Sequence, residues 1–308
     1  MNKLNLLEIE KIINETGDYS IINELLTSLG DYANIPGCFI MYRDDLYETF
    51  KTYHHHDIYE MIYIIDGCVD FYIEEKKYEL TNGDMALIPS NILHKLEYNN
   101  SNKCKRVIIN FTEEYCQKFQ SGQTDILNVF KATLDGGIHK ISFHSDKRKI
   151  LEKNFETMNN NMLSKEFGAD LRFSISFADI MLLINTVYMK LPEEDLIQKN
   201  INDPYVVKII EYIKDNIQDK ILLSDIASHV SLSISRMCHL FKDVTGTTII
   251  NYIIKKRLIL AKNLLKEGEQ IKSIYYKCGF PDEASFFRFF KKEYGLSPKK
   301  YLTTLKHI

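Results

Sequence analysis

Residues 35–111 show the short runs of apolar and polar positions that are typical of β-strands. The stretch "EMIYIIDGCVDFYIEEKKYELTNGDMALIPSNILHKLEY", which begins at Glu60, is rich in Ile, Tyr, Val and Phe. Turn signals interrupt it at Asp66-Gly67, Glu75-Lys76 and Asn82-Gly83-Asp84. Several short strands at this spacing predict a β-sandwich or β-barrel, which the segment 106–111 would close.

Beyond residue 145 the apolar residues recur at spacings of three and four, which predicts helices over 146–163 and 168–190. The second of these is apolar around much of its circumference, and its apolar face runs from Phe177 to Val187. Such a helix must be buried. The pattern alone does not decide whether it packs on the barrel or against another subunit.

A polar stretch over 191–203, with Pro192 and Pro204 near its ends, is interpreted as a linker. Everything after Tyr205 has helical periodicity. The predicted helices end near glycines, which adopt left-handed conformations at little cost: Gly246, Gly268, Gly279 and Gly295. The predicted fold class is therefore α+β. Its parts are a β-barrel over 1–144, a helical hairpin over 145–190, the linker over 191–203 and an all-α domain over 204–308.

An internal repeat organises the last hundred residues. The segment "SDIASHVSLSISRMCHLFKDVTG" (224–246) aligns with "KSIYYKCGFPDEASFFRFFKKEYG" (272–295). Each copy reads as a short helix, a turn and a longer helix that ends in Phe-Lys, which is the outline of a helix-turn-helix. The longer helices would be anchored by apolar residues, namely Met237, Leu240 and Phe241 in one copy and Phe286, Phe289 and Phe290 in the other.

The opposite face of each longer helix is polar and partly basic, as a helix that enters the DNA major groove requires. The residues on these faces are Ser235, Arg236, His239 and Lys242 in the first copy and Glu283, Ser285, Arg288 and Lys292 in the second. A connecting helix of about 20 residues would span about 30 Å, close to the ~34 Å between successive major grooves. Ordinary solvated helix faces are the alternative, which the repeat disfavours.

Charge divides along the chain in the same way. Residues 203–308 carry 18 Lys and Arg against 11 Asp and Glu, while the whole chain has a net charge of −3. A basic C-terminal third on an otherwise acidic chain favours a polyanion as partner, although chance segregation would give the same pattern. The six cysteines form no Cys-x-x-Cys pair, there is no apolar run of 18 residues, and acids lie within the first apolar segment. These features predict a cytoplasmic protein with no membrane partner.

The C-terminal domain resembles the DNA-binding domain of the AraC/XylS family of bacterial transcription regulators. The resemblance lies in "DIASHVSLSISRMCHLFKDVTG", "YIIKKRLILAKNLL" and above all "CGFPDEASFFRFFKKEYGLSPKKY". It implies a two-headed module that binds promoter DNA, and a dimerisation hairpin in the place of the helices at 145–190. Arg257 matches an arginine of the family pattern, for which we expect a structural role between the two halves.

The resemblance also implies which side chains meet DNA. Base-reading positions would be Ser235, Cys238 and His239 in the first copy and Glu283 and Arg288 in the second. Phosphate contacts, which position the protein without specifying sequence, are expected from Arg236, Lys242, Lys255, Lys256, Lys291, Lys292 and Lys299.

Three consecutive histidines precede the first strong strand, in "TYHHHDIYE". The spacing of His54, His56, Glu60 and His94 resembles the cupin motifs, whose matching positions hold a metal ion in metal-binding cupins. Residues two apart on a strand point to the same side, and three imidazoles with a carboxylate suit Zn, Fe, Mn or Ni. Four alternatives stay open: a polar ligand pocket, a metal without catalysis, satisfied structural residues, or a metalloenzyme.

A ligand pocket could also use nearby rings and hydroxyls. Tyr42, Tyr63 and Arg43 are candidate contacts, together with the histidines and Glu60. Stacking faces and fixed hydrogen-bonding groups suit a sugar, although most of the tyrosines could instead be core residues.

Together these patterns predict a ligand-responsive, sequence-specific DNA-binding regulator. We expect an activator of sugar or carbon-source genes that acts as a homodimer, binds double-stranded promoter DNA and a small-molecule effector, and works with RNA polymerase. No cofactor is required, although a divalent metal could occupy the cupin-like pocket. The alternative is a metal-dependent cupin enzyme with an appended helical domain.

Overall fold

The computed structural model describes residues 35–45, 53–97, 104–134, 137–192 and 203–305. They fall into two compact units, of which the first consists of residues before 202 and the second of residues 202–308 together with the short segments 51–53 and 74–76. Nearly all of the predicted linker, and residues 1–34 of the predicted first domain, lie outside the described residues.

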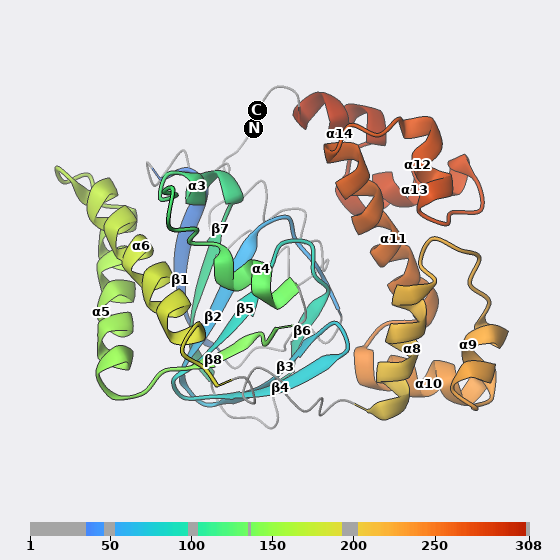
Figure 1. Cartoon of the computed structure of the whole chain (residues 1–308), viewed down its shortest axis with the longest axis horizontal. Coiled ribbons are helices and arrows are strands. Elements are labelled where there is room, and N and C mark those ends of the chain that lie inside the picture. Colours follow the sequence, from blue (N-terminus) through green and yellow to red (C-terminus); the bar gives the residue numbers. More distant parts are fainter. Residues whose placement is uncertain (1–34, 46–52, 98–103, 135–136, 193–202, 306–308) are drawn as a thin grey trace. The chain divides into compact units, whose positions relative to one another are not determined.

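Two β-sheets form the centre of the first unit (Figure 1). The larger sheet has the order β1 (Cys38–Asp45), β7 (Cys104–Phe111), β2 (Tyr59–Asp66), β5 (Asp84–Ile88) and β8 (Lys140–Ser142). The smaller sheet has the order β4 (Lys76–Thr81), β3 (Cys68–Ile73) and β6 (His94–Glu97). The described strands therefore make a two-sheet, cupin-like arrangement, not one continuous closed barrel. The segment predicted to close it, β7, is an inner strand of the larger sheet, because β1 pairs with one of its edges and β2 with the other.

The turn between β4 and β5 shows why the strands start and stop where they do. Gly83 has φ +92°, and a Cβ there would lie 2.8 Å from the backbone oxygen of Phe143, so only glycine fits. The Asp84 carboxylate accepts hydrogen bonds from the backbone N–H and hydroxyl of Thr81, at 2.8 and 3.0 Å. The Asn82-Gly83-Asp84 signal of the sequence is thus a tight turn that sets the register of β5.

Alternate residues of the central strands face two different apolar cores. Ile62 and Ile64 of β2 belong to the apolar cluster between the two sheets. Met61 and Tyr63, on the other face, belong to the cluster beneath the helices. A strand whose residues are buried on both faces reads as a nearly continuous apolar run, as "EMIYII" does.

Helices α5 (Ser145–Met162) and α6 (Ala169–Tyr188) form a hairpin beside the larger sheet (Figure 1). Both begin and end within two residues of the predicted ranges. Phe177 and Ile184 of α6 are fully buried in the core shared with the sheet. The apolar face from Phe177 to Val187 therefore packs within its own unit, which answers the question that the sequence pattern left open.

By length and composition α6 could cross a membrane, because its most apolar window has a mean hydropathy of 1.3. Half of that window is buried inside this unit, as in the core helix of a globular protein, so this is weak evidence for a span. Two short helices, α3 (Glu113–Gln117) and α4 (Asn128–Leu134), and strand β8 also belong to the described part of this unit and were not predicted.

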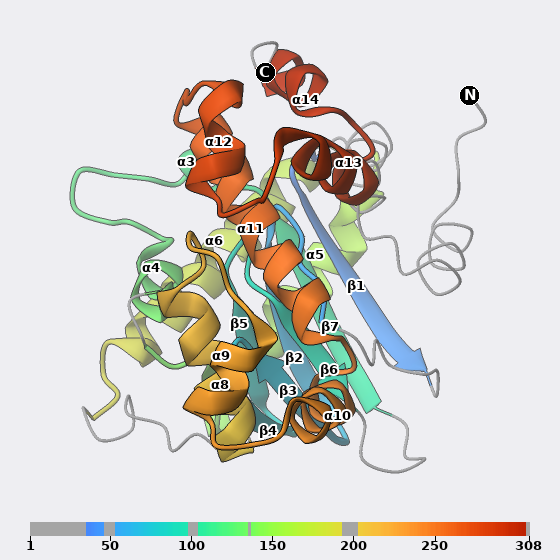
Figure 2. The same ribbon diagram turned by 90° about the vertical axis from the view of Figure 1, so that its right-hand side faces the viewer.

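The second unit is helical, as predicted, and contains two helix-turn-helix motifs (Figures 1 and 2). Its helices are α8 (Pro204–Asp215), α9 (Leu223–His229), α10 (Ile234–Thr245), α11 (Ile249–Lys266), α12 (Ile271–Lys277), α13 (Glu283–Tyr294) and α14 (Pro298–Leu305). The motifs are α9–α10 and α12–α13, and α11 connects them. Gly246 and Gly295 follow α10 and α13 in the left-handed conformation, which confirms their predicted role at helix ends.

Candidate functional site

The first reading head is the helix pair α9–α10. Ser233 caps α10 by accepting a hydrogen bond from the backbone N–H of Arg236 at 3.3 Å. Met237 and Phe241 are fully buried and hold the helix in place. The predicted DNA-facing residues lie on the other side, with Cys238 half-buried and the rest exposed: Ser235, Arg236, Cys238, His239 and Lys242.

A hollow of about 180 Å³ adjoins this head. Its lining combines side chains of α10 with the beginnings of α9 and α11: Leu223, Cys238, His239, Lys242, Thr248, Ile249 and Ile250. Three of the predicted DNA contacts thus share one concave surface.

The second reading head is the pair α12–α13, whose longer helix is anchored by the fully buried Phe286 and Phe290. Asp282 caps α13, accepting the backbone N–H of Ser285 at 2.6 Å and its hydroxyl at 3.0 Å. These bonds lower the pKa of the Asp282 carboxyl. The guanidinium of Arg288 lies 4.9 Å from the ring centre of Phe289. Four predicted contacts are exposed on this head: Glu283, Arg288, Lys291 and Lys292.

The sequence did not reveal that the hydroxyl of Ser285 is used within the protein. It donates to Asp282 and helps to close the capping motif. A Ser three residues after an Asp N-cap could have suggested this bond.

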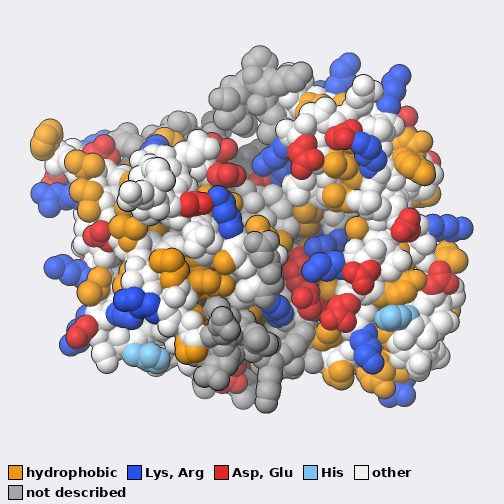
Figure 3. Space-filling model, viewed as in Figure 1, with side chains coloured by type: hydrophobic (Ala, Val, Ile, Leu, Met, Phe, Trp, Pro, Cys, Tyr) orange, Lys and Arg blue, Asp and Glu red, His pale blue; other side chains and the backbone are white. Residues whose placement is uncertain are grey.

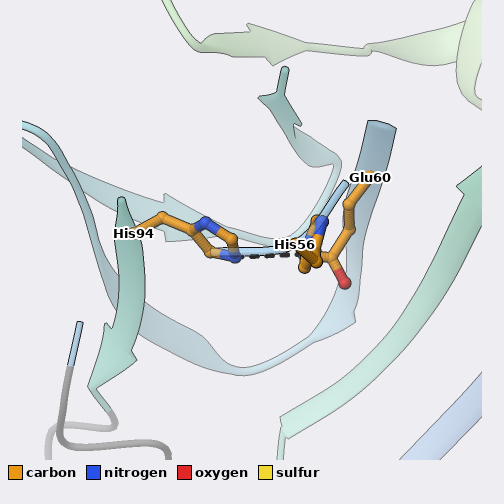
Figure 4. Close-up of side chains that lie close together, drawn as sticks. All are labelled: His56, Glu60 and His94. Carbon is orange, nitrogen blue, oxygen red and sulfur yellow. Dashed lines mark hydrogen bonds and ion pairs between the residues drawn. The ribbon is translucent and has the colours of Figure 1, made fainter. Parts of the chain in front are cut away.

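The four cupin-like residues occupy the region between the two sheets. His56 precedes β2, Glu60 lies on β2 of the larger sheet, and His94 begins β6 of the smaller sheet. The Nε2 atoms of His56 and His94 lie 3.2 and 3.4 Å from the same carboxylate oxygen, Oε2 of Glu60. Figure 4 shows the three side chains pointing toward one another. His54 pairs with His94 through two backbone hydrogen bonds, and their ring centres lie 4.2 Å apart.

Backbone carbonyls determine which nitrogen of each imidazole carries a proton. Nδ1 of His56 donates to the carbonyl of Ile58 at 2.9 Å, and Nδ1 of His94 donates to that of Ile92 at 2.8 Å. A neutral imidazole whose Nδ1 is a donor has a bare Nε2. Burial lowers the pKa of His94, which favours that neutral form.

Glu60 is buried, and burial alone would raise the pKa of its carboxyl. Hydrogen bonds donated to Glu60 by Nε2 of His56 and of His94, in the form in which those nitrogens carry a proton, outweigh that effect and lower the pKa of the Glu60 carboxyl well below its usual range. The cluster therefore holds a carboxylate between two imidazoles, whose Nε2 atoms donate to it when protonated and offer electron pairs when neutral. These three side chains place one ligand atom each within 4.8 Å of one another.

Asn110 is a site residue that sequence reasoning missed. It lies on β7 directly opposite Glu60, so the two side chains share the face between the sheets. Asn110 is 3% exposed, and within the described part of the chain its Oδ1 has no hydrogen-bond partner. A polar amide inside the otherwise apolar run "VIINF" was the available signal.

Asn91 lies in the turn between β5 and β6. Its φ is +62°, a conformation that Asn tolerates better than most residues. Its backbone N–H donates to the carbonyl of His56 at 2.7 Å, which connects the turn to the cluster.

Three predicted ligand contacts are not brought to this cluster. Tyr63 points to the opposite face of β2, and its hydroxyl donates to Glu152 of α5 at 2.9 Å. Tyr42 is 44% exposed, and its pKa is raised to about 12 by partial burial and by the α5 carboxylates of Glu156 and Glu152. Arg43 pairs in register with Arg106, four residues along β7 from Asn110. Strand alternation explains why the prediction for Tyr63 was wrong: Tyr63 is three residues from Glu60 on β2, so the two side chains lie on opposite faces of the strand.

Comparisons with known proteins agree for both units. Residues 226–304 match the model of a helix-turn-helix domain, and residues 38–136 match that of an AraC-like ligand binding domain. The probable transcriptional regulator LumQ of Photobacterium leiognathi is 27% identical over 264 residues, which cover 84% of this chain and 95% of LumQ. The HTH-type transcriptional activator RhaS of Escherichia coli (strain K12 / DH10B) is 22% identical over 251 residues, or 80% of this chain and 85% of RhaS.

Among solved structures, ToxT from Vibrio cholerae O395 aligns over 88% of this chain and 98% of its own, at 17% identity. The TM-score of this alignment is 0.34. The matched models and the sequence relatives describe transcription regulators and not enzymes.

Proposed function

This chain belongs to the AraC family of transcription regulators, and we propose that it controls promoters in response to a small polar effector. Binding of DNA is the function of the helical unit. The observation that carries the proposal is the exposure of the polar faces of α10 and α13, whose opposite faces are buried. We infer activation of sugar or carbon-source genes, with contact to RNA polymerase, in the cytoplasm.

On the first head, Ser235, Cys238 and His239 are the proposed base-reading residues, because they follow the cap of α10 on its exposed side. On the second head, Glu283 and Arg288 take that role, and Arg can bind guanine through two hydrogen bonds. Phosphate contacts are assigned to Arg236, Lys242, Lys291 and Lys292. Ser285 is assigned to the cap of α13, since its hydroxyl already bonds Asp282.

Selection from a randomised duplex library tests this function directly. We expect enrichment of a two-part motif and an affinity that falls steeply as salt rises, because several phosphates are neutralised. No enriched motif, or an affinity indifferent to salt, would remove DNA as the partner. A run-off transcription assay with RNA polymerase then gives the sign of regulation.

The proposed effector site is the polar cluster between the two sheets, formed by His56, Glu60, His94 and Asn110. Its inward groups are two acceptors, the Glu60 carboxylate and the Asn110 amide oxygen, and two imidazole nitrogens that donate or accept according to their protonation. A ligand that presents several donors, as a sugar or another polyol does, complements such a set. The family relationship supports an effector in this unit, because its residues match the ligand-binding model.

A thermal-shift screen against a sugar panel tests the effector. A ligand at 100 times its Kd should stabilise the protein by about 2.7 kcal/mol. Asn110→Ala should remove that shift for the same ligand, whereas Glu79→Gln, at an exposed position of β4, should keep it. A shift that survives Asn110→Ala would place the effector elsewhere.

A divalent metal is the second candidate for the same cluster, favoured by one specific observation. Metal-bound histidines characteristically donate their other ring N–H to a carbonyl or carboxylate, and both His56 and His94 do so here. His56, Glu60 and His94 would hold the ion, with Zn, Fe, Mn or Ni suited to two imidazoles and a carboxylate. Such an ion would supply a Lewis acid that binds an oxygen of the effector.

Elemental analysis of the purified protein separates these candidates. One equivalent of metal in the wild type, lost in His94→Ala but kept in Glu79→Gln, would establish a metal site. Turnover of a substrate together with that metal would support the enzyme alternative. Metal without turnover would leave the regulator in place.

We propose further that the chain forms a homodimer through α6, on a different face from the one that the sequence suggested. The face from Phe177 to Val187 is used in the core. The outer side of α6 exposes large apolar residues at spacings of four and seven: Leu171, Ile175, Leu182 and Met189. Such a stripe is typical of a helix–helix seam, and Figure 3 shows hydrophobic side chains exposed over this hairpin at the left.

Light scattering on size-exclusion fractions tests the dimer. Leu182→Glu should convert dimer to monomer by placing a charge in the seam. Ile150→Glu is the matched control, because Ile150 is 50% exposed on the partner helix α5 and lies outside the stripe. A wild-type monomer at micromolar concentration, or a Leu182→Glu dimer, would refute this interface.

A further inference from the structure

Arg257 occupies a buried position midway along the connecting helix α11. Its side chain is 9% exposed. Nε donates to the backbone carbonyl of Ile217 at 3.0 Å, and Nη2 donates to that of Asp219 at 2.6 Å. Both acceptors belong to the loop that follows α8 and leads into the first reading head.

Gly279 brings the second reading head to the same loop. It lies in the turn between α12 and α13 with φ +75°. A Cβ at Gly279 would lie 2.8 Å from the carbonyl oxygens of Ile217 and Gln218 and 2.9 Å from Nη2 of Arg257. Such distances mean that the turn of the second head packs backbone to backbone on the loop of the first half, with the guanidinium beside both.

Three segments that are far apart in sequence therefore meet at one guanidinium: the α8–α9 loop, the middle of α11 and the turn of the second motif. α11 has 18 residues and by itself determines only how far apart the heads lie, at about 1.5 Å per residue. The rotation of the second head about the axis of α11 needs another restraint. The contact of Gly279 with a loop clamped by Arg257 supplies it, because backbone atoms in van der Waals contact cannot slide without breaking the clamp.

Arginine is suited to this place by geometry as well as by charge. Its planar fork donates in fixed directions to two acceptors at once. A lysine ammonium, whose three N–H groups all belong to one nitrogen, lacks the separated donor nitrogens with which Arg257 reaches both carbonyls. Burial lowers the pKa of Arg257, and the carbonyl dipoles around it compensate for the lost hydration of a group that stays charged.

We propose that Arg257 and Gly279 form a positioning joint that sets the relative orientation of the two reading helices, and with it the spacing of the two DNA half-sites. This inference rests on the proposed DNA-binding function. Arg257 and Gly279 need not touch the DNA in this role. They determine specificity for operator spacing through the heads that they hold.

Selection from a randomised duplex library tests the joint, with the full-length wild type, Arg257→Lys and the matched control Arg172→Lys on the exposed side of α6. Wild type and Arg172→Lys should enrich two half-sites at a single spacing. Arg257→Lys should enrich the same half-sites over several spacings. A single, unchanged spacing for folded Arg257→Lys would overturn the joint while leaving DNA binding in place, whereas no motif for the wild type would overturn both.

A second measurement needs no variant and so does not depend on the folding of Arg257→Lys. The wild type is titrated with its selected duplex and with duplexes that carry one or two extra base pairs between the half-sites. A rigid joint predicts a loss of affinity of at least about tenfold, the scale of one good bidentate base contact. Equal affinity for all three duplexes would show that the heads move independently and would overturn the proposal. If Gly279→Ala folds as completely as the wild type, it should weaken binding to the selected duplex more than binding to a duplex that carries only one half-site.

Discussion

The two reading heads are copies of one motif, and the positions at which they differ separate scaffold from function. In the longer helices Met237 corresponds to Phe286 and Phe241 to Phe290, and all four are fully buried. His239 corresponds to Arg288, and both are exposed. Buried positions thus stay apolar while exposed positions change charge and shape.

The heads also differ in how their cores are filled. Ala227 is buried on α9, the short helix of the first head. Tyr275 occupies the corresponding position on α12, the short helix of the second head, and is half-buried. Around Tyr275 the second core is aromatic, with ring centres of Phe286 at 5.4 Å from Phe280 and 5.6 Å from Phe290. The side chain of Tyr275 is larger than that of alanine, and the second head accommodates it because the surrounding side chains form an aromatic cluster that is wider than the core of the first head. The same fold therefore does not require the same residues at matching positions, only side chains that fill the space between the helices.

The largest expected effect concerns these cores. Phe286→Ala should destabilise the protein by about 3–5 kcal/mol and Met237→Ala by about 2–5 kcal/mol, since each removes a fully buried side chain. Chemical denaturation measures both. Tyr276→Ala, which truncates an aromatic side chain that is 77% exposed on α12, should change stability little. Equal, small losses for all three variants would show that the heads are not packed as described.

The next effect concerns the exposed positions. Arg288→Ala should reduce discrimination between the selected duplex and random DNA by about 1–3 kcal/mol, the contribution of a bidentate base contact. Lys299→Ala, on the exposed side of α14, should weaken binding to the selected duplex and to random DNA by the same factor, because a phosphate contact carries no sequence information. Competition titrations distinguish the two outcomes. Equal losses on both duplexes for Arg288→Ala would reassign it to the phosphates.

A smaller effect concerns the cap of the first head. Ser233→Ala should cost about 1 kcal/mol of stability, because the N–H of Arg236 loses its acceptor. Ser235→Ala, two residues later and exposed, serves as the control and should lie within about 0.5 kcal/mol of the wild type. If the two variants proved indistinguishable by denaturation, the capping bond would contribute nothing.

The smallest effect is a pH dependence that only the second head should show. Hydrogen bonds from Ser285 lower the pKa of Asp282 in the folded state. The ionised Asp282 carboxylate therefore stabilises the folded state above the unfolded pKa of about 3.9. This stabilisation is lost as pH falls through the lower pKa of the folded state. The denaturation midpoints of wild type and Asp282→Asn should differ at pH 7 and converge toward pH 3. Asp243→Asn, an exposed acid on α10, is the matched control, and a constant difference for Asp282→Asn would contradict the charge-dependent cap.

Much of the fold could be predicted because its signals are local. The repeat, the glycines after α10 and α13, and the turn at Asn82-Gly83 all act within a few residues of the structure that they specify. The short elements α3, α4 and β8 were missed, since three to seven residues give too little periodicity. The His56, Glu60 and His94 cluster was found from spacing, but Asn110 was not, because its place opposite Glu60 depends on strand pairing.

The amino-acid sequence by itself determined the class of this protein: a β-rich unit with a histidine–carboxylate cluster and a helical unit with two copies of one DNA-binding motif. Periodicity, turn residues and the internal repeat are properties of neighbouring residues, and they need no knowledge of what packs against them. Only the tertiary structure decided what the apolar face of α6 packs against, that Tyr63 turns away from the cluster while Asn110 joins it, and that Arg257 clamps a loop against Gly279. Each of those outcomes depends on partners that are distant along the chain, and pairing and packing, not local pattern, bring them together.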